Sequence, residues 1–158
     1  MRKTLVAYFS ASGVTRAAAE QLAAAVQADL YEIRPETLYT AADLDWTNKN
    51  SRSTLEMQDL NCRPALADDT LDMAKYDVVF VGFPIWWGRE PSVVDSFLTS
   101  YDFKGKYIIP FCTSGGSDIG NTAQRIRELT GANVKEGKLL GGTVSEEDLK
   151  LWTDGLGL

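Results

Sequence analysis

The segment from residue 6 to residue 22 constrains the fold of this chain more than any other. A short apolar run, Thr4–Phe9, leads directly into a loop of small and hydroxyl residues, which leads into an alanine-rich stretch expected to be helical over Thr15–Ala28. Such a loop offers backbone N–H groups and the positive end of a helix dipole. It contains no lysine, whereas a nucleoside triphosphate loop places a lysine on the outer phosphates. The segment therefore predicts a site for one terminal phosphate, with an ordinary helix cap as the alternative. Its three hydroxyl donors are Ser10, Ser12 and Thr15.

The length of 158 residues favours one domain spanning residues 1–158. No apolar run approaches the roughly 20 residues that a membrane-spanning helix needs. Only five consecutive apolar residues, Leu5–Phe9, precede the hydroxyl loop. Such a run is too short for the apolar region of a secretory signal peptide. We therefore expect a cytoplasmic protein.

The charge balance and the rare side chains exclude several classes of function. Sixteen basic and 22 acidic residues give a net charge of −6, which argues against a nucleic-acid partner and favours either a basic protein partner or solubility alone. Histidine is absent, which removes the commonest metal ligand. Cys62 and Cys112 are far apart, so neither a disulfide framework nor a zinc site is indicated.

Apolar runs alternate with amphipathic stretches along the chain, a pattern typical of an α/β protein with a parallel sheet and helices on both faces. A long polar connection, Glu36–Asp72, is expected to contain one or two short helical turns and to cover one sheet face, with a functional loop as the alternative. Ser145 is a candidate N-cap for the last helix. The expected strands are Thr4–Phe9, Leu30–Ile33, Val78–Phe83, Tyr107–Cys112 and, more weakly, Leu139–Val144. The expected helices after the first are Pro91–Leu98, Ile119–Leu129 and Glu146–Trp152.

Two further loops are expected at the carboxyl ends of strands, where ligands bind in doubly wound sheets. The third-strand loop holds adjacent tryptophans, at least one of which should be exposed and stack on a flat heteroaromatic ring; a protein interface or a cap on the sheet end is the alternative. The fourth-strand loop has two glycines that let backbone approach a ligand closely, or it is a glycine-rich turn. With the first loop, they describe a ligand with a phosphate at one end and a flat polar ring at the other.

The run from Val6 to Thr15, followed by Ala19 and Leu22, resembles the flavodoxin signature, although Ala7 is smaller than that family prefers. The stretches Pro-Ile-Trp-Trp-Gly and Thr-Ser-Gly-Gly-Ser are similar to those of short bacterial flavodoxin-like proteins, so the resemblance extends from Thr4 to Trp152. It implies a flavodoxin-like doubly wound sheet of five parallel strands in the order 2-1-3-4-5, with FMN as the cofactor.

The resemblance also implies which residues bind FMN. The first loop would hold the phosphate, the third-strand loop would pack beside the isoalloxazine, and the fourth-strand loop would border its pyrimidine end. The implied cofactor-binding residues are Ser10, Ala11, Ser12, Gly13, Val14, Thr15, Pro84, Ile85, Trp86, Trp87, Gly88, Thr113, Ser114, Gly115, Gly116 and Ser117. No catalytic or metal-binding residue is expected.

The implied function is low-potential one-electron transfer between redox partner proteins, a reductase and an electron acceptor. Neutral phosphate donors would disfavour negative charge on the flavin, Glu90, Asp95 and Asp118 would add to this effect, and Arg89 would oppose it. The fourth-strand loop lacks the aromatic residue that covers the outer flavin face in many flavodoxins. That face is either open to a small planar acceptor or covered by Trp46, Trp86 or Trp87.

The open face keeps an FMN-dependent NAD(P)H:quinone-type oxidoreductase as the alternative. A phospho-receiver domain is set aside, because the first and third strands end without the carboxylates that it needs. Either a monomer or a homodimer is compatible with the sequence.

Overall fold

Six parallel strands form the sheet of the computed structural model, which describes residues 3–11, 13–67, 71–113, 119, 122–140 and 145–156. The order is β2-β1-β3-β4-β5, and β6 pairs with β4 beyond β5. This confirms the doubly wound order 2-1-3-4-5 expected from the sequence. The strands are β1 (Thr4–Tyr8), β2 (Asp29–Glu32), β3 (Val78–Pro84), β4 (Tyr107–Thr113), β5 (Asn133–Val134) and β6 (Lys138–Leu139).

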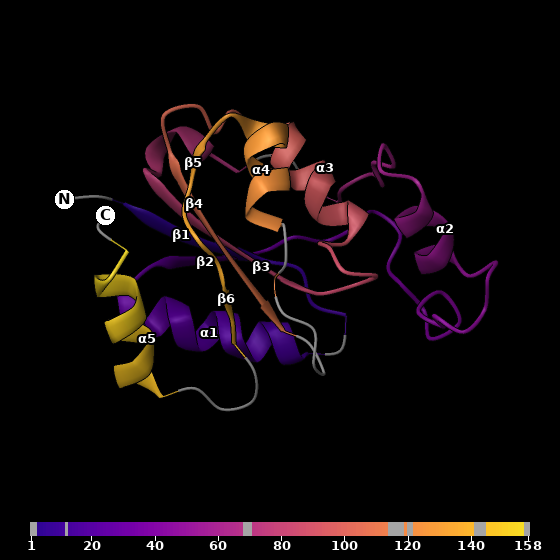
Figure 1. Ribbon diagram of the computed structural model, residues 1–158, viewed down its shortest axis with the longest axis horizontal. Coiled ribbons are helices and arrows are strands. Elements are labelled where there is room, and N and C mark those ends of the chain that lie inside the picture. The colour runs from indigo at the N-terminus through magenta and orange to yellow at the C-terminus, as the bar shows by residue number, and fades with distance from the viewer. Residues whose placement is uncertain are drawn as a thin grey trace.

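Helices cover both faces of the sheet, with α1 and α5 on one face and α3 and α4 on the other (Figure 1). The Ser145 side chain accepts a hydrogen bond from the Asp148 N–H, which confirms the expected N-cap of α5. No helix among the described residues is long and apolar enough to cross a membrane. The helices are α1 (Val14–Val26), α2 (Arg52–Gln58), α3 (Ser92–Ser100), α4 (Thr122–Thr130) and α5 (Glu146–Asp154), with a 3₁₀ turn, η1, at Met73–Lys75.

Alternate residues of each central strand point to opposite faces of the sheet and pack into two separate apolar cores. Ala7 of β1 packs into the core beneath α3 and α4, whereas Val6 packs into the core beneath α1 and α5. The α1 face contributes Ala19 and Leu22, both fully buried. Burial on both faces is why the central strands are continuous apolar runs in the sequence.

The edge of the sheet beside β4 differs from the expected fifth strand. We expected that strand at Leu139–Val144; β6 begins at Lys138, residues 141–144 lie outside the described part, and β5 was not expected at all. Ile108 pairs with Val134, and Phe111 pairs with Lys138. An advance of three residues along β4 therefore corresponds to an advance of four residues along the neighbouring segment from β5 to β6. One extra residue therefore forms a bulge in the edge strand.

Pro110 explains the position of this bulge. The carbonyl oxygens of Ile108 and Cys112 accept hydrogen bonds from the edge segment, so Pro110, midway between them, faces the same edge. Proline has no N–H to donate, so regular pairing cannot continue past it. Gly137 passes close to Pro110 here: a Cβ on Gly137 would lie 2.5 Å from the Pro110 carbonyl oxygen.

The long connection between β2 and β3 contains α2, a short helix of the kind expected within Glu36–Asp72, and η1 begins directly after that stretch. Its middle part does not cover a sheet face as expected. Instead α2 lies beside the N-terminal part of α3, away from both faces of the sheet (Figure 1). Ser92 of α3 donates to the Glu56 carbonyl oxygen at 3.1 Å, and Ser96 donates to the Pro64 carbonyl oxygen at 2.7 Å. Serine hydroxyls of α3 thus anchor backbone that has no strand partner.

Candidate functional site

The loop after β1 is organised around Gly13. Gly13 has φ +94°, a left-handed value that glycine adopts without steric cost, and its N–H donates to Ser10 Oγ at 3.0 Å. Ser10 uses its oxygen in this bond, so its hydroxyl proton remains free to be donated. Helix α1 begins at Val14, and its cap residue, Gly13, has no side chain to bind the first N–H groups. Ser12, also expected in this loop, lies outside the described residues.

Thr15, which is expected to bind the phosphate, contacts the end of β4 in the structure. Its side chain is buried, and its hydroxyl lies 2.7 Å from the hydroxyl of Thr113 at the end of β4. Each hydroxyl can donate in this pair, and each retains capacity for another hydrogen bond. Thr15 therefore joins the first loop to the start of the fourth-strand loop. Of the expected fourth-strand residues, only Thr113 is described; Ser114, Gly115, Gly116 and Ser117 lie outside the described part.

The third-strand loop closes as a tight turn from Trp86 to Arg89. The backbone N–H of each residue donates to the carbonyl oxygen of the other, at 3.0 and 3.2 Å. The two central residues, Trp87 and Gly88, have φ of +50° and +78°. Positive φ at both positions is typical of a type I′ turn, in which asparagine and glycine are preferred. A tryptophan at such a position is strained, and such strain is concentrated at functional sites.

The adjacent tryptophans play different structural parts. Trp86 packs edge-to-face on Phe9, at 5.6 Å between ring centroids, and on Tyr39, at 5.5 Å. Trp87 is 49% exposed. The expectation that at least one of them is exposed is therefore confirmed, and the exposed one is Trp87. Trp86 is fixed by its packing against the aromatic side chains of Phe9 and Tyr39.

A cavity of about 400 Å³ opens between the first loop, the third-strand loop and the β2–β3 connection. Its wall is mostly apolar and aromatic, as in pockets for planar ligands. One polar atom stands out: Ser53 Oγ is buried and has no hydrogen-bond partner among the described residues. A buried hydroxyl without a partner is costly, so this wall fits a flat ligand with a polar edge. The lining residues are Ala11, Leu44, Trp46, Ser53, Pro84, Ile85, Trp86 and Trp87.

Sequence reasoning named most of this wall but missed Leu44 and Ser53. Both lie in the β2–β3 connection, whose weak periodicity gave no signal for them. Trp46, named as a possible cover, does line the cavity, although its side chain is 74% exposed.

Tyr39 forms a second fixed wall beside the first loop. Its hydroxyl donates to Glu56 Oε1, and the Arg52 guanidinium lies over its ring at 4.0 Å from the centroid. Burial, followed by the hydrogen bond to Glu56, raises the pKa of Tyr39 far above its usual value, so the ring stays neutral. Tyr39 also lines a neighbouring hollow of about 360 Å³ that shares Ala11 with the main cavity.

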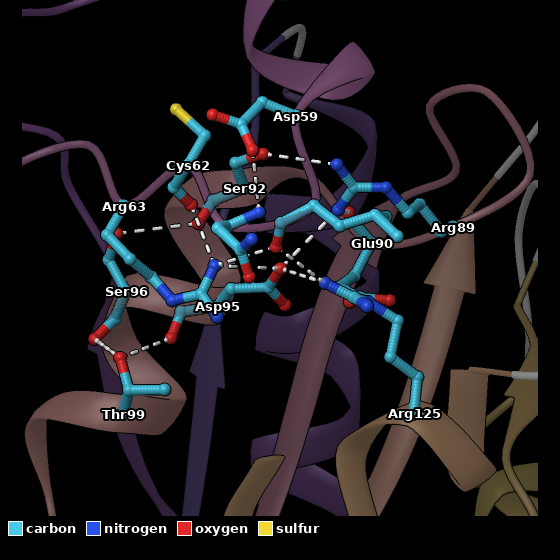
Figure 2. A network of polar contacts seen from close by, with 12 residues as sticks. Asp59, Cys62, Arg63, Arg89, Glu90, Ser92, Asp95, Ser96, Thr99 and Arg125 are labelled. Carbon is cyan, nitrogen blue, oxygen red and sulfur yellow. Dashed lines mark hydrogen bonds and ion pairs between the residues drawn. The ribbon is translucent and has the colours of Figure 1, made fainter. Parts of the chain in front are cut away.

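Behind the Trp86–Arg89 turn, two buried carboxyl groups meet three arginines (Figure 2). The Arg125 guanidinium bonds Glu90 Oε1 at 2.5 Å and Asp95 Oδ2 at 2.7 Å. Arg89 lies 3.4 Å from Asp95, and Arg63 lies 3.8 Å from it. Burial, then the contact with Asp95, raises the pKa of Glu90 to about 8. Glu90 and Asp95 were expected to add negative charge around the flavin, but the structure places both in a network with arginines.

A flavodoxin family model matches residues 3–156 of the sequence. The chain belongs to the flavodoxin family. The match covers nearly the whole chain and confirms the family expected from the first loop. FMN is the cofactor that this family implies.

Solved structures with the same fold agree with the family match. A protein of Bacteroides eggerthii, assigned as a flavoprotein, is 47% identical, with a TM-score of 0.95 and coverage of 100% of this family member and 99% of that chain. A Bacteroides uniformis protein with the same assignment is 48% identical over 97% of this chain and 98% of its own, with a TM-score of 0.92. A Lactobacillus acidophilus flavoprotein in complex with FMN shares the fold at 21% identity, with a TM-score of 0.71 and full coverage of both chains. No curated protein matches the sequence of this family member.

Proposed function

We propose that the chain binds FMN at the carboxyl edge of its sheet and acts as a low-potential one-electron carrier between redox partner proteins. The observation that carries the proposal is the cavity between the first loop and the Trp86–Trp87 turn, with Ser53 Oγ buried and unpartnered in its wall. A flat ring with a polar edge and a phosphate on a short tether matches this cavity and the adjacent start of α1. FMN supplies the electron chemistry when bound.

Each part of the site has a separate task in binding. The first loop, Ser10 to Thr15, would hold the phosphate with neutral donors: the Ser10 hydroxyl proton and the first N–H groups of α1. Trp87 would lie against the ring, and Ser53 would bond its polar edge. The residues from Thr113 to Ser117 are proposed to border the ring on the other side, as the family resemblance implies.

An exposed edge supports electron transfer to a partner protein. Trp87 is about half exposed and Trp46 about three-quarters exposed, and both line the cavity, so the ring would lie close to the protein surface. The net charge of −6 favours encounter with a partner that carries a basic surface. Neutral phosphate donors leave the negative charge gained on reduction uncompensated, and a low potential follows.

The test is an anaerobic titration of the FMN-loaded protein with dithionite, followed by visible absorbance. Two resolved one-electron steps, and no reduction when NADPH replaces dithionite, are expected for a carrier. Direct reduction by NADPH in a single two-electron step would favour the NAD(P)H:quinone-type oxidoreductase instead. Failure of the protein to bind FMN would overturn the proposed function altogether.

A further inference from the structure

Glu90 and Asp95 are the least expected charged groups in the structure, because both side chains are completely buried. Ionised carboxylates at such positions need full hydrogen bonding. Each group here has one oxygen that is bonded by Arg125. The second oxygen of each group, Glu90 Oε2 and Asp95 Oδ1, is buried and has no donor within the described part of the chain.

The two carboxyl groups lie side by side on the same Arg125 guanidinium, which contacts Glu90 Oε1 at 2.5 Å and Asp95 Oδ2 at 2.7 Å (Figure 2). Two carboxylates this close repel one another when both are ionised. A single proton between them removes the repulsion and gives a donor to oxygens that otherwise lack one. One proton therefore removes the charge repulsion and also supplies the missing hydrogen-bond donor.

We propose that Glu90 and Asp95 share one proton in the native protein, and that this buried pair binds its proton more tightly when negative charge is added in the neighbouring cavity. The second part rests on the proposed function, because FMN reduction is the source of that charge. At a pH where the pair has lost its proton, reduction makes it take the proton back from solvent, while the electron comes from the external reductant and no bond in the protein is broken.

Arg89 connects the pair to the cavity. Its guanidinium lies 3.4 Å from Asp95 and donates to the Met57 carbonyl oxygen of α2 at 3.1 Å, while its backbone closes the turn that presents Trp87. Glu90 follows Arg89 directly in the sequence. The pair therefore lies behind the cavity wall, in a medium where charges interact strongly. Negative charge in the cavity raises the proton affinity of the pair, and by reciprocity the protonated pair raises the potential of the cofactor.

The other titratable and charged groups around the pair come from four elements. Arg125 projects from α4, Arg89 from the turn, and Arg63 and Cys62 from the β2–β3 connection. Glu56 of α2 is bonded to Arg52 and Tyr39 instead. Burial raises the pKa of the Cys62 thiol, so it stays neutral near neutral pH, and the arginines keep their charge. Among these groups, Glu90 is the one whose pKa is raised toward neutral pH, to about 8.

The first experiment needs no cofactor. Infrared spectra of the full-length apoprotein, recorded from mildly acidic to mildly alkaline pH, should show the C=O stretch of a protonated carboxyl at neutral pH. Glu90→Gln should remove this band, because the glutamine amide bonds Asp95 without a titrating proton, and Asp95→Asn should also remove it. Glu128→Gln, which changes an exposed carboxyl on the same helix as Arg125, should leave it unchanged. Absence of the band from the native apoprotein, or its persistence in both variants, would overturn the shared proton.

The second experiment measures the midpoint potential of the FMN-loaded protein against pH. The slope of the midpoint potential against pH reports how many protons are taken up per electron. Over the pH range in which the infrared band disappears, this slope should be steeper for the native protein than for Glu90→Gln. Equal slopes for the two proteins would overturn the coupling. If the chain fails to bind FMN, the proposed function and the coupling both fall, while the infrared result decides the shared proton by itself.

Discussion

The hydroxyl groups of Thr15 and Thr113 lie 2.7 Å apart, although 98 residues separate them in the sequence. Thr15 stands in the first turn of α1, and Thr113 is the last residue of β4. Their hydrogen bond joins two of the three loops around the proposed cofactor site. The hydrogen bond therefore ties the start of α1 to the end of β4.

Thr15→Val tests this connection. We expect the variant to lose about 1–2 kcal/mol of unfolding free energy, because valine keeps the volume but leaves the buried Thr113 hydroxyl without a partner. It should also bind FMN more weakly. Urea unfolding of the apoprotein and fluorescence titration with FMN measure the two effects, and Thr15→Ser, which keeps the hydroxyl, is the matched control. A Thr15→Val protein that binds FMN as tightly as the parent would remove Thr15 from the site.

Trp87→Asn should separate stability from binding. Asparagine adopts positive φ more readily than tryptophan, so the apoprotein should gain about 1 kcal/mol of unfolding free energy. The same change removes the aromatic surface proposed to lie against the flavin, so FMN affinity should fall and its visible spectrum should shift. Unaltered affinity and spectrum would show that Trp87 does not contact the ring.

Trp86→Ala should destabilise the apoprotein, in contrast to the gain in stability expected for Trp87→Asn. Trp86 packs against Phe9 and Tyr39, so its loss should cost about 3 kcal/mol of unfolding free energy, in the range for large aromatic side chains. Urea unfolding of the apoprotein measures this, with Trp87→Ala as the comparison. A Trp86→Ala protein as stable as Trp87→Ala would contradict the division between a packed and an exposed tryptophan.

Gly82→Ala should disturb β3 just before the turn. A Cβ at this position would lie 2.1 Å from Phe111 Cζ on the neighbouring strand, so the ring must move. Overpacking of this kind costs about 1–3 kcal/mol. Adding Phe111→Leu to the variant should recover part of the loss, and this double-mutant cycle is measured by chemical denaturation. Independent, additive effects would show that the two residues do not compete for space.

The stability of the apoprotein should depend on pH through Glu90. Its pKa is near 4.5 in the unfolded chain and about 8 in the folded protein, so between these values the folded protein holds more protons. The unfolding free energy therefore falls as pH rises through this window, by at most about 1.4 kcal/mol per pH unit for one group, and levels off above it. Glu90→Gln should flatten this part of the profile, whereas Glu128→Gln should keep it. A native profile that is flat in the window would rule out the raised pKa.

The sheet and the first loop could be predicted because local sequence determines them. Buried parallel strands are apolar along their whole length, and the order 2-1-3-4-5 follows from the family to which the loop signature belongs. The bulge opposite Pro110 could not be predicted, since it depends on how β4 and residues 133–139 align, and the two segments are distant in sequence.

The sequence predicted which loops form the site, but it did not predict most of the side-chain contacts within it. The sequence predicted that at least one of Trp86 and Trp87 is exposed, but it did not indicate which one, nor the tight turn from Trp86 to Arg89. The sequence did not indicate that Glu90 and Asp95 form a buried pair, because Arg125, their main partner, is 30 or more positions away and no local pattern indicates the contact. Ser53 gave no signal, since a single serine in a polar connection has the same appearance whether it faces a cavity or solvent.

The interrupted edge at β5 and β6 has a consequence for how copies of this protein meet. A long, regular outer strand would present a continuous row of free N–H and C=O groups, on which a second sheet edge could align. Here each paired stretch is only two residues long, and the bulge at Gly137 breaks the row between them. On the opposite edge, β2 begins with Asp29 and ends with Glu32. Both margins of the sheet therefore discourage the strand-to-strand aggregation to which open sheets are prone.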